Sequence, residues 1–188
     1  MAVLMLFGAA CTPKDAALST PAPVNTGTIT DSAPYLCKLI PQRAFQLVSG
    51  VNRPLSEKVG GNDETGNCWT PDAMPNSLEV AWMQEAVDST RVYLDEVMDD
   101  RRKVFTRHEA AVLPADLGEG YAVRFPIVQA DEQPYQVVAR FNCGDKQRII
   151  TLYLAQTARG RDGIKDMIEL MRIAQKRYGQ LYKCTPGE

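Results

Sequence analysis

The stretch QVVARFNCGDKQRIITLYL, residues 136–154, decides the fold of this chain. Two β-rich runs, 136–143 and 147–154, flank a Gly-Asp-Lys tripeptide at 144–146. A glycine and an aspartate between two such runs are typical of a β-hairpin. Three apolar residues of the second run share one face of the expected strand, because side chains alternate along it: Ile150, Leu152 and Leu154. We therefore predict a hairpin with one buried face.

Alternation of apolar residues predicts two further strands upstream of this hairpin. Every second residue is apolar at 121–125 and again at 78–82, which is the period of a strand with one buried face. We expect both segments to belong to the same antiparallel sheet as the hairpin.

Apolar residues three and four positions apart predict two long helices. One runs from Asp88 or Ser89, either of which can cap it, to about Lys103. The other begins near Asp162 and ends at Gly179. The residues expected to face inward are Leu94, Val97 and Met98 in the first helix, and Ile164, Met167, Ile168, Met171, Ala174 and Tyr178 in the second.

A shorter helix is expected between residues 40 and 50, where Pro41 suits the first turn and Gly50 can end the helix. The segment 57–67 that follows is rich in glycine, asparagine and acidic residues, and we interpret it as a mobile loop. Its Asp63-Glu64 pair lacks the ordered acidic spacing of a calcium-binding loop, so we expect a solvated loop here.

The order of helices and strands indicates an α+β domain in which helices cover an antiparallel sheet. The chain has 188 residues, and roughly 150 of them remain for this domain once an N-terminal segment is set aside, enough for one hydrophobic core. The formal net charge is −2 with both signs interspersed, so the composition shows no electrostatic footprint for nucleic acid. We expect one domain over 35–188 and no nucleic-acid partner.

The N-terminal sequence MAVLMLFGAAC, residues 1–11, has the form of a secretion signal that ends in a cysteine. A short apolar run leads into Gly8-Ala9-Ala10-Cys11, which resembles the bacterial lipobox. The resemblance implies that residues 1–10 are removed as a signal peptide and that Cys11 carries a diacylglycerol membrane anchor. Residues 11–34 are rich in Thr, Ser, Pro and Ala, so we expect a lipidated, disordered tether.

Four cysteines remain besides Cys11: Cys37, Cys68, Cys143 and Cys184. An even set in an exported chain predicts disulfides, and four thiols allow three pairings. We favour Cys37 with Cys68 and Cys143 with Cys184, because each pair closes one continuous segment and both bridges can form without threading. No cysteine lies in a Cys-x-x-Cys spacing, which argues against a redox or zinc site.

Two segments, 32–51 and 66–82, carry a pattern that extends beyond the cysteines. The first contains a Cys-x-Leu-Ile unit that opens a helix ending in glycine, and the second contains a Cys-Trp pair that enters a strand. The positions concerned are Cys37, Leu39, Ile40, Gly50, Cys68 and Trp69. With the lipobox cysteine, this pattern resembles a family of small actinobacterial lipoproteins of unknown function. The resemblance covers about half of the chain, transfers no catalytic residues and, by fold-level analogy, implies a PsbP-like layout.

Candidate catalytic residues are few. His108, the single histidine, lies in a charged segment without neighbouring metal ligands or a nucleophile motif, so we interpret it as a surface residue. Four carboxylates of the helix that begins near 88 lack a partnering histidine and are expected to form a solvated face: Asp95, Glu96, Asp99 and Asp100. We predict no catalytic, cofactor-binding or metal-binding residues.

The sequence favours a non-enzymatic lipoprotein of the cell envelope, anchored on the extracytoplasmic face of the cell membrane. Such a protein would act as a binding, accessory or sensory module, and its partner would be an envelope protein or a cell-wall ligand. An alternative hypothesis is an extracytoplasmic enzyme with a dispersed site around His108. A further hypothesis is a cytosolic or structural protein with a misleading N-terminus, for which free thiols would be the signature. The oligomeric state stays open.

Overall fold

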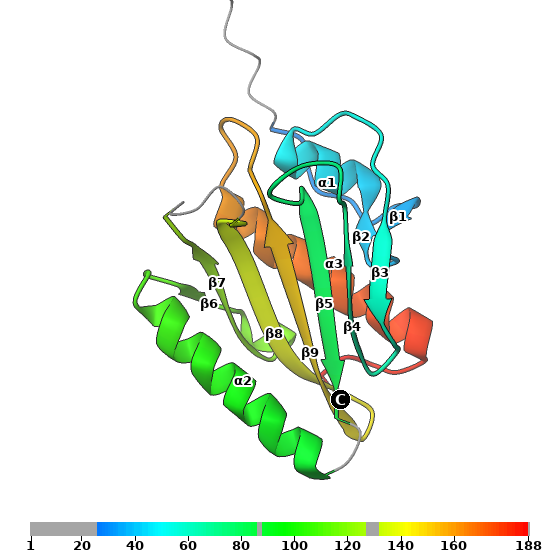
Figure 1. The fold of residues 1–188 in the computed structure, drawn as a ribbon, viewed down its shortest axis with the longest axis vertical. Coiled ribbons are helices and arrows are strands. Elements are labelled where there is room, and N and C mark those ends of the chain that lie inside the picture. The colour runs from blue at the N-terminus through cyan, green and yellow to red at the C-terminus, as the bar shows by residue number, and fades with distance from the viewer. Residues whose placement is uncertain (1–25, 86–87, 127–131, 188) are drawn as a thin grey trace, which may run out of the picture.

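A computed structural model describes residues 26–85, 88–126 and 132–187 of the chain (Figure 1). The main sheet has seven strands: β3 (Lys58–Gly61), β4 (Thr65–Trp69), β5 (Leu78–Gln84), β6 (Ala111–Val112), β7 (Glu119–Arg124), β8 (Tyr135–Cys143) and β9 (Lys146–Leu154). The other elements are a ribbon of β1 (Tyr35–Leu36) and β2 (Ile40–Pro41), the helices α1 (Gln42–Ser49), α2 (Asp88–Thr106) and α3 (Gly163–Tyr182), and a 3-10 turn at Ala115–Leu117. These elements confirm the predicted α+β class.

Strands β8 and β9 form the predicted hairpin, and β9 is the central strand of the sheet. Gly144 lies in the two-residue connection with φ at 68°, a left-handed conformation that suits a tight hairpin turn. The strand order is β3-β4-β5-β9-β8-β7-β6, and every neighbouring pair is antiparallel. The strands predicted at 78–82 and 121–125 correspond to β5 and β7.

Adjacent residues of the central strands enter two separate cores on opposite faces of the sheet. Ile150 lies in the larger core with residues of α1 and α3, whereas its neighbour Ile149 packs with Leu94, Met98 and Phe105 of α2. Figure 1 shows α3 running behind the sheet. The three residues predicted to share a buried face of β9 all lie in the larger core, so the helices and the sheet form three layers.

The segment 57–67, which we predicted to be a mobile loop, contains the antiparallel hairpin of β3 and β4. A Cβ on Gly61 would lie 2.3 Å from the carbonyl oxygen of Thr65, so the turn requires glycine there. The side-chain oxygen of Asn62 closes the turn by accepting hydrogen bonds of 2.9 Å from the backbone N–H groups of Glu64 and Thr65. The prediction was wrong because glycine and asparagine, which often mark loops, here form a tight turn between strands.

Helix α3 begins after Asp162, whose carboxylate caps it by accepting a backbone hydrogen bond of 3.1 Å from the first turn. The helix does not end at Gly179 as predicted but continues to Tyr182. A Cβ on Gly179 would lie 2.5 Å from the carbonyl oxygen of Cys184, because the chain folds back along the helix after it ends. Gly179 therefore allows a close approach of the C-terminal tail rather than ending the helix.

The folded region reaches further toward the N-terminus than the predicted boundary at Tyr35. Ile29 packs against the larger core. The carboxylate of Asp31 accepts hydrogen bonds from the hydroxyl of Tyr35 at 2.9 Å and from the ammonium of Lys176 at 2.8 Å. The end of the predicted tether is thus part of the domain, and one of its partners, Lys176, lies on α3, far away in the sequence.

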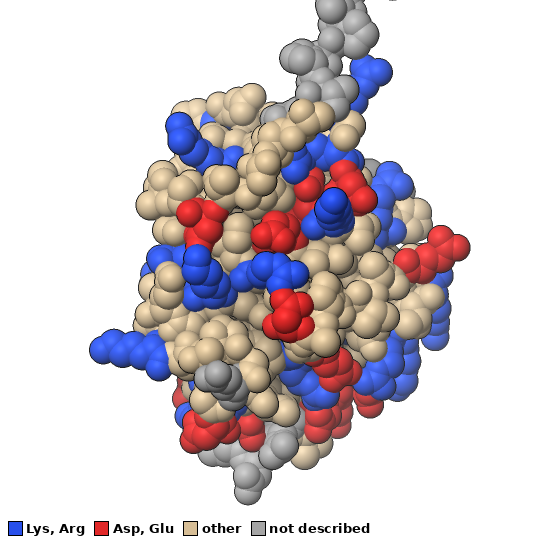
Figure 2. All heavy atoms as spheres, turned by 180° about the vertical axis from the view of Figure 1, so that it is seen from behind, with Lys and Arg blue, Asp and Glu red and all other residues tan. Residues whose placement is uncertain are grey.

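The surface behind the sheet carries charges of both signs. Figure 2 shows acidic and basic side chains interspersed over this face, which therefore presents no large patch of a single sign. Pairs such as Lys176 with Asp31, at 2.8 Å, join opposite charges directly. Within the described part of the chain, no helix is both long and apolar enough to cross a bilayer.

Candidate functional site

A cavity of about 170 Å³ lies beside the β3–β4 hairpin, and we call it the disulfide cavity. The turn between β1 and β2, strand β5 and the C-terminal end of α3 complete its walls, which include Cys37, Leu39, Cys68, Trp82, Tyr178 and Tyr182. Hollows of about 590, 810 and 570 Å³ elsewhere among the described residues are more open to solvent. Four polar side chains also line it, namely Lys38, Glu57, Asn62 and Asp63, and a partly enclosed hollow that combines apolar walls with polar groups is a candidate small-molecule site.

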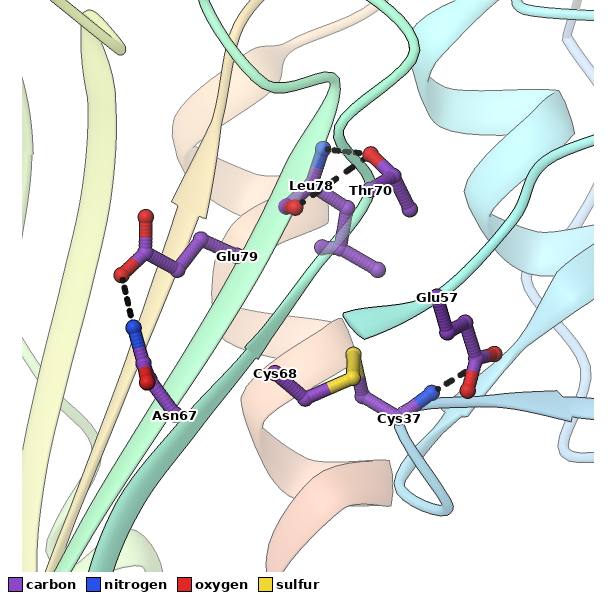
Figure 3. The surroundings of a disulfide bond; sticks show 7 residues. All are labelled: Cys37, Glu57, Asn67, Cys68, Thr70, Leu78 and Glu79. Atoms are coloured by element: carbon purple, nitrogen blue, oxygen red, sulfur yellow. Dashed lines mark hydrogen bonds between the residues drawn. A yellow bond between two sulfur atoms is a disulfide. The ribbon is translucent and has the colours of Figure 1, made fainter. Parts of the chain in front are cut away.

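The disulfide between Cys37 and Cys68 forms one wall of the cavity (Figure 3). The Cα atoms of the pair are 5.5 Å apart. Of the three possible pairings, this is one that the sequence favoured. Glu57 accepts a hydrogen bond of 3.1 Å from the backbone N–H of Cys37. Cys37 and Lys38 have φ angles of 51° and 60°, a left-handed conformation that costs of order 1–3 kcal/mol for each non-glycine residue. The disulfide and Glu57 hold this strained turn against the hairpin.

Polar contacts lock β4 against β5 on both sides of Cys68 (Figure 3). The backbone N–H of Leu78 donates to the hydroxyl of Thr70 at 3.0 Å, and the N–H of Thr70 donates to the carbonyl of Leu78, also at 3.0 Å. The side-chain amide of Asn67 donates to the carboxylate of Glu79 at 3.2 Å. These contacts hold the strand that carries Cys68 in register with the strand that carries Trp82.

Trp82 is positioned by the same hairpin. Its indole N–H donates a hydrogen bond of 2.8 Å to the carbonyl oxygen of Asn62. Gly66 lies opposite Trp82 in the β4–β5 ladder, and a Cβ on Gly66 would lie 2.6 Å from a ring carbon of Trp82. The absence of a side chain at Gly66 therefore makes room for the indole ring at the edge of the cavity.

Exposed apolar side chains concentrate at this cavity. Seven large apolar residues are exposed within the described ranges, and three of them line it: Val59 at 64%, Leu181 at 41% and Tyr182 at 38%. Single exposed apolar residues are ordinary on protein surfaces. Three around one cavity instead form an apolar mouth, which is typical of an interaction site.

Tyr178 supplies a buried polar group to the cavity wall. The residue is only 2% exposed, and its hydroxyl has no hydrogen-bond partner among the described residues. Burial raises the pKa of the Tyr178 phenol; Arg148 opposes this effect, and the carboxylate of Asp63 adds to it. Leaving a buried hydroxyl unpaired costs about 1–3 kcal/mol. Arg148 lies beside this hydroxyl and is itself buried, so the polar end of Tyr178 faces an arginine inside the domain rather than open space in the cavity.

Glu57 lies close enough to the disulfide to form a grouping of ligand-type atoms. One carboxylate oxygen of Glu57 and the sulfur atoms of Cys37 and Cys68 lie within 4.8 Å of one another. Metal binding by cysteine requires thiolates, and the disulfide consumes both sulfur atoms. The arrangement is therefore a disulfide with a neighbouring carboxylate that holds a turn.

The second favoured pairing, Cys143 with Cys184, also occurs, with the two Cα atoms 5.2 Å apart. It links the end of β8 to the tail that follows α3. The backbone N–H of Gly187 donates to the carbonyl of Asn142 at 2.9 Å beside it. This disulfide fixes the tail against the β8–β9 hairpin, and neither of its cysteines lines the disulfide cavity.

His108 lies just after α2 and is exposed. Its ring contacts Phe125 edge-on, with the ring centroids 4.9 Å apart. Within the described part of the chain, no carboxylate forms an ion pair with it. The contacts at His108 are those of a surface residue, which is how the sequence was interpreted.

Two of the helical carboxylates bind arginines of the sheet and helix rather than facing water alone. Asp95 pairs with Arg140, and Asp99 pairs with Arg102 at 3.1 Å. Glu119 of β7 joins both arginines into one network. Burial opposes ionisation of Glu119, but hydrogen bonds from Arg102 and Arg140 outweigh it and lower its pKa. These charges attach α2 to the sheet.

Some residues of the cavity were not singled out from the sequence as site residues. Tyr178 was predicted only as a buried helix position, and Trp82 only as a strand position. The signal that the sequence offered was the spacing of Gly61, Asn62 and Gly66, which is typical of a hairpin turn. The cavity lies beside that hairpin. Cys11 lies outside the described residues, so its lipidation stays a prediction.

Comparisons with protein-family models, with curated proteins and with solved structures find no match to this chain. The resemblance to an actinobacterial lipoprotein family and the PsbP-like layout therefore remain predictions.

Proposed function

We propose that this protein is a lipid-anchored binding module on the extracytoplasmic face of the cell membrane, and that its ligand site is the disulfide cavity. In this proposal the chain performs no catalysis. The anchor is Cys11, and the secretion signal in residues 1–11 supports this location outside the cytoplasm. Two disulfides suit an oxidising compartment outside the cytoplasm.

The disulfide cavity is the observation that carries the binding function. It combines a strained turn, held by a disulfide and Glu57, with an apolar mouth. Strained backbone persists where the surrounding structure enforces it, and it clusters at functional sites. Two carboxylates of α2, Asp95 and Asp99, are instead used in ion pairs with arginines.

The membrane address is tested by the intact mass of the protein extracted from membranes. We expect a chain that begins at Cys11 and carries a diacylglycerol increment, with four thiols appearing only after reduction. The matched control is Cys11→Ala, which should lose the increment and leave the membrane fraction. An unprocessed wild-type chain in the soluble fraction would contradict the anchor.

The ligand site is tested by two-dimensional ¹H–¹⁵N NMR of the full-length Cys11→Ala chain, oxidised and free of lipid. Small uncharged ring compounds are added as probes. We expect their largest amide shifts at Gly61, Asn62 and Leu181, which line the cavity. Shifts confined to the larger hollows, such as the one lined by Gly160 and Lys165, would move the site elsewhere.

A further inference from the structure

We propose that the disulfide cavity binds an extended peptide segment that pairs with the open edge of β3. One apolar side chain of the peptide enters the cavity, and a basic side chain two positions before it lies beside Asp63. This inference rests on the proposed function, because it names the partner class of the same site. It follows from the place of β3 in the sheet, the size of the cavity and the charges at its mouth.

Strand β3 forms an open edge of the sheet beside the cavity. It is the first strand in the sheet order and pairs only with β4 (Figure 1). Natural proteins usually protect such an edge with charges, proline or a bulge, because an unprotected edge can pair with another chain. The one charged residue of β3, Lys58, alternates with Val59 and so points to the other face of the sheet. On the cavity face the edge presents Val59, which is 64% exposed.

The backbone N–H and C=O of Val59 point to this open edge. In the β4–β5 ladder the N–H of Thr70 donates to the carbonyl of Leu78 at 3.0 Å. Backbone groups alternate in direction along a strand, so those of Cys68, two residues before Thr70, also point to β5. Val59 lies opposite Cys68, and its own groups therefore point away from β4. Within the described ranges, no backbone group of another segment hydrogen-bonds them.

The same face of β3 lines the cavity. Glu57, Val59 and Gly61, at every second position, all contribute to its wall. Every neighbouring pair of strands in the sheet is antiparallel, and antiparallel pairing is also slightly more stable per residue than parallel pairing. A peptide strand added antiparallel to β3 therefore continues the sheet. Every second side chain of that peptide lies on the cavity face.

Size limits the side chain that enters. The cavity measures about 170 Å³, and an apolar cavity of about 150 Å³ accommodates a benzene molecule. Side chains on one face of a strand are about 7 Å apart, so only one of them can occupy this volume. The walls offer Leu39 and the ring of Trp82, with Leu181 at the mouth. A phenylalanine or leucine side chain fits these dimensions.

Charge at the mouth selects the neighbouring residue of the peptide. Asp63 lies in the turn that follows β3 and forms no ion pair within the described part of the chain. One of its oxygens lies 3.5 Å from the hydroxyl of Tyr182. A carboxylate beside an aromatic ring suits a lysine or arginine side chain. Lys38 and Glu57 carry opposite charges, so the other end of the cavity has no net sign. An antiparallel peptide begins at the turn end, so its basic residue precedes the apolar one.

Two N-methylated peptides test the strand pairing. The parent is a blocked seven-residue peptide of threonines, with phenylalanine at its centre and lysine two positions before it. One derivative is methylated at the backbone nitrogens of the phenylalanine and of the residue two positions after it, which should face β3. The matched derivative is methylated at the two threonines beside the phenylalanine, whose N–H groups should point to solvent. All are titrated into the full-length oxidised Cys11→Ala chain and followed by amide NMR.

We expect the first derivative to bind at least about tenfold more weakly than the parent, because hydrogen bonds to the edge are lost and the methyl groups meet β3. The second derivative should differ from the parent by less than about twofold. Replacing the phenylalanine by alanine should weaken binding about tenfold or more, since the buried ring is lost. The largest amide shifts should lie at Val59 and Gly61.

A pair of protein variants tests the charge preference. A peptide with glutamate in place of the lysine should bind the wild-type domain about fivefold more weakly at low salt. Asp63→Asn should bring this ratio close to one. The matched control is Glu64→Gln, which removes a carboxylate from the same turn that does not line the cavity, and it should reduce the ratio far less.

Four results overturn the inference. If both methylated peptides bind as tightly as the parent, the strand pairing is wrong. If Asp63→Asn leaves the lysine preference unchanged, the position of the basic residue is wrong. If no peptide shifts the cavity amides at millimolar concentration while the ring compounds do, the partner class is wrong but the cavity remains the ligand site; if the ring compounds also fail, the proposed site fails as well. A chain that sediments as a dimer and binds none of the peptides would assign the edge to a second copy.

Discussion

Removing the Cys37–Cys68 disulfide should destabilise the domain and deform the ligand site together. The perturbation is the double substitution Cys37→Ala with Cys68→Ala. The two residues are 31 positions apart, and on the chain-entropy estimate their link destabilises the unfolded chain by about 3.7 kcal/mol at 25 °C. Loss of the link also removes one of the contacts that hold the left-handed turn at Cys37 and Lys38, which leaves the hydrogen bond to Glu57 and the β1–β2 pairing.

The second disulfide provides a matched control. Cys143 and Cys184 are 41 positions apart, so the same estimate assigns them about 3.9 kcal/mol. If chain entropy dominates, Cys143→Ala with Cys184→Ala destabilises the domain nearly as much as the first pair does. Only the Cys37–Cys68 pair forms a wall of the cavity with both of its residues, so only its removal should also abolish binding of the small ring compounds by the folded protein.

The assay is urea unfolding without reductant, followed by tryptophan fluorescence, with titrations of the small uncharged ring compounds at urea concentrations where each variant is folded. Two outcomes refute the reasoning. A loss of unfolding free energy below about 1 kcal/mol for the first pair would contradict the loop-closure argument. Unchanged affinity for the ring compounds in the folded variant would show that the disulfide does not shape the site.

Three further substitutions test other parts of the structure. Gly179→Ala should destabilise the domain although alanine favours helices by about 1 kcal/mol, because its Cβ would lie 2.5 Å from the carbonyl oxygen of Cys184; a higher melting temperature would contradict this packing. Glu119 has a lowered pKa in the folded protein, so its ionisation stabilises the fold above its unfolded pKa and this contribution is lost as pH falls through the folded pKa. Urea unfolding should therefore show a larger loss of stability for Glu119→Gln at pH 7 than at pH 3, and an equal gap at both values would count against the ion pairs. Ile29→Ala should lower the free energy of unfolding by about 1 kcal/mol. An unchanged free energy would indicate that residues 26–34 belong to the tether and not to the domain.

Periodic patterns in the sequence were enough to predict most of the framework. The hairpin at 136–154, the strand at 78–82 and the helix capped by Asp162 depend on apolar residues that repeat every two or three to four positions. Such a pattern follows from one buried face, so it can be recognised locally. The favoured disulfide pairs also followed from local segments, since each pair closes a continuous stretch of chain.

The sequence led to wrong predictions for the roles of two glycines, Gly61 and Gly179. Gly179 carries no signal that distinguishes a helix end from a close approach by the tail, because the contacting atom belongs to Cys184 beyond the helix. Gly61 likewise marked a loop when its actual role is a tight hairpin turn. In both cases the deciding neighbour is a particular atom in space, which composition does not encode.

The sequence alone determined the α+β class, the main strands and helices, the cysteines that pair and the expectation of an N-terminal anchor. Only the tertiary structure decided where a ligand would bind. The disulfide cavity needs Cys37, the β3–β4 hairpin, Trp82 and the end of α3 in one place, and these segments are dispersed along the chain. The sequence predicted that Tyr178 is buried, because burial follows from helical periodicity. Whether its hydroxyl finds a partner depends on the atoms that distant segments bring around it, and a pattern of residue types does not contain that information.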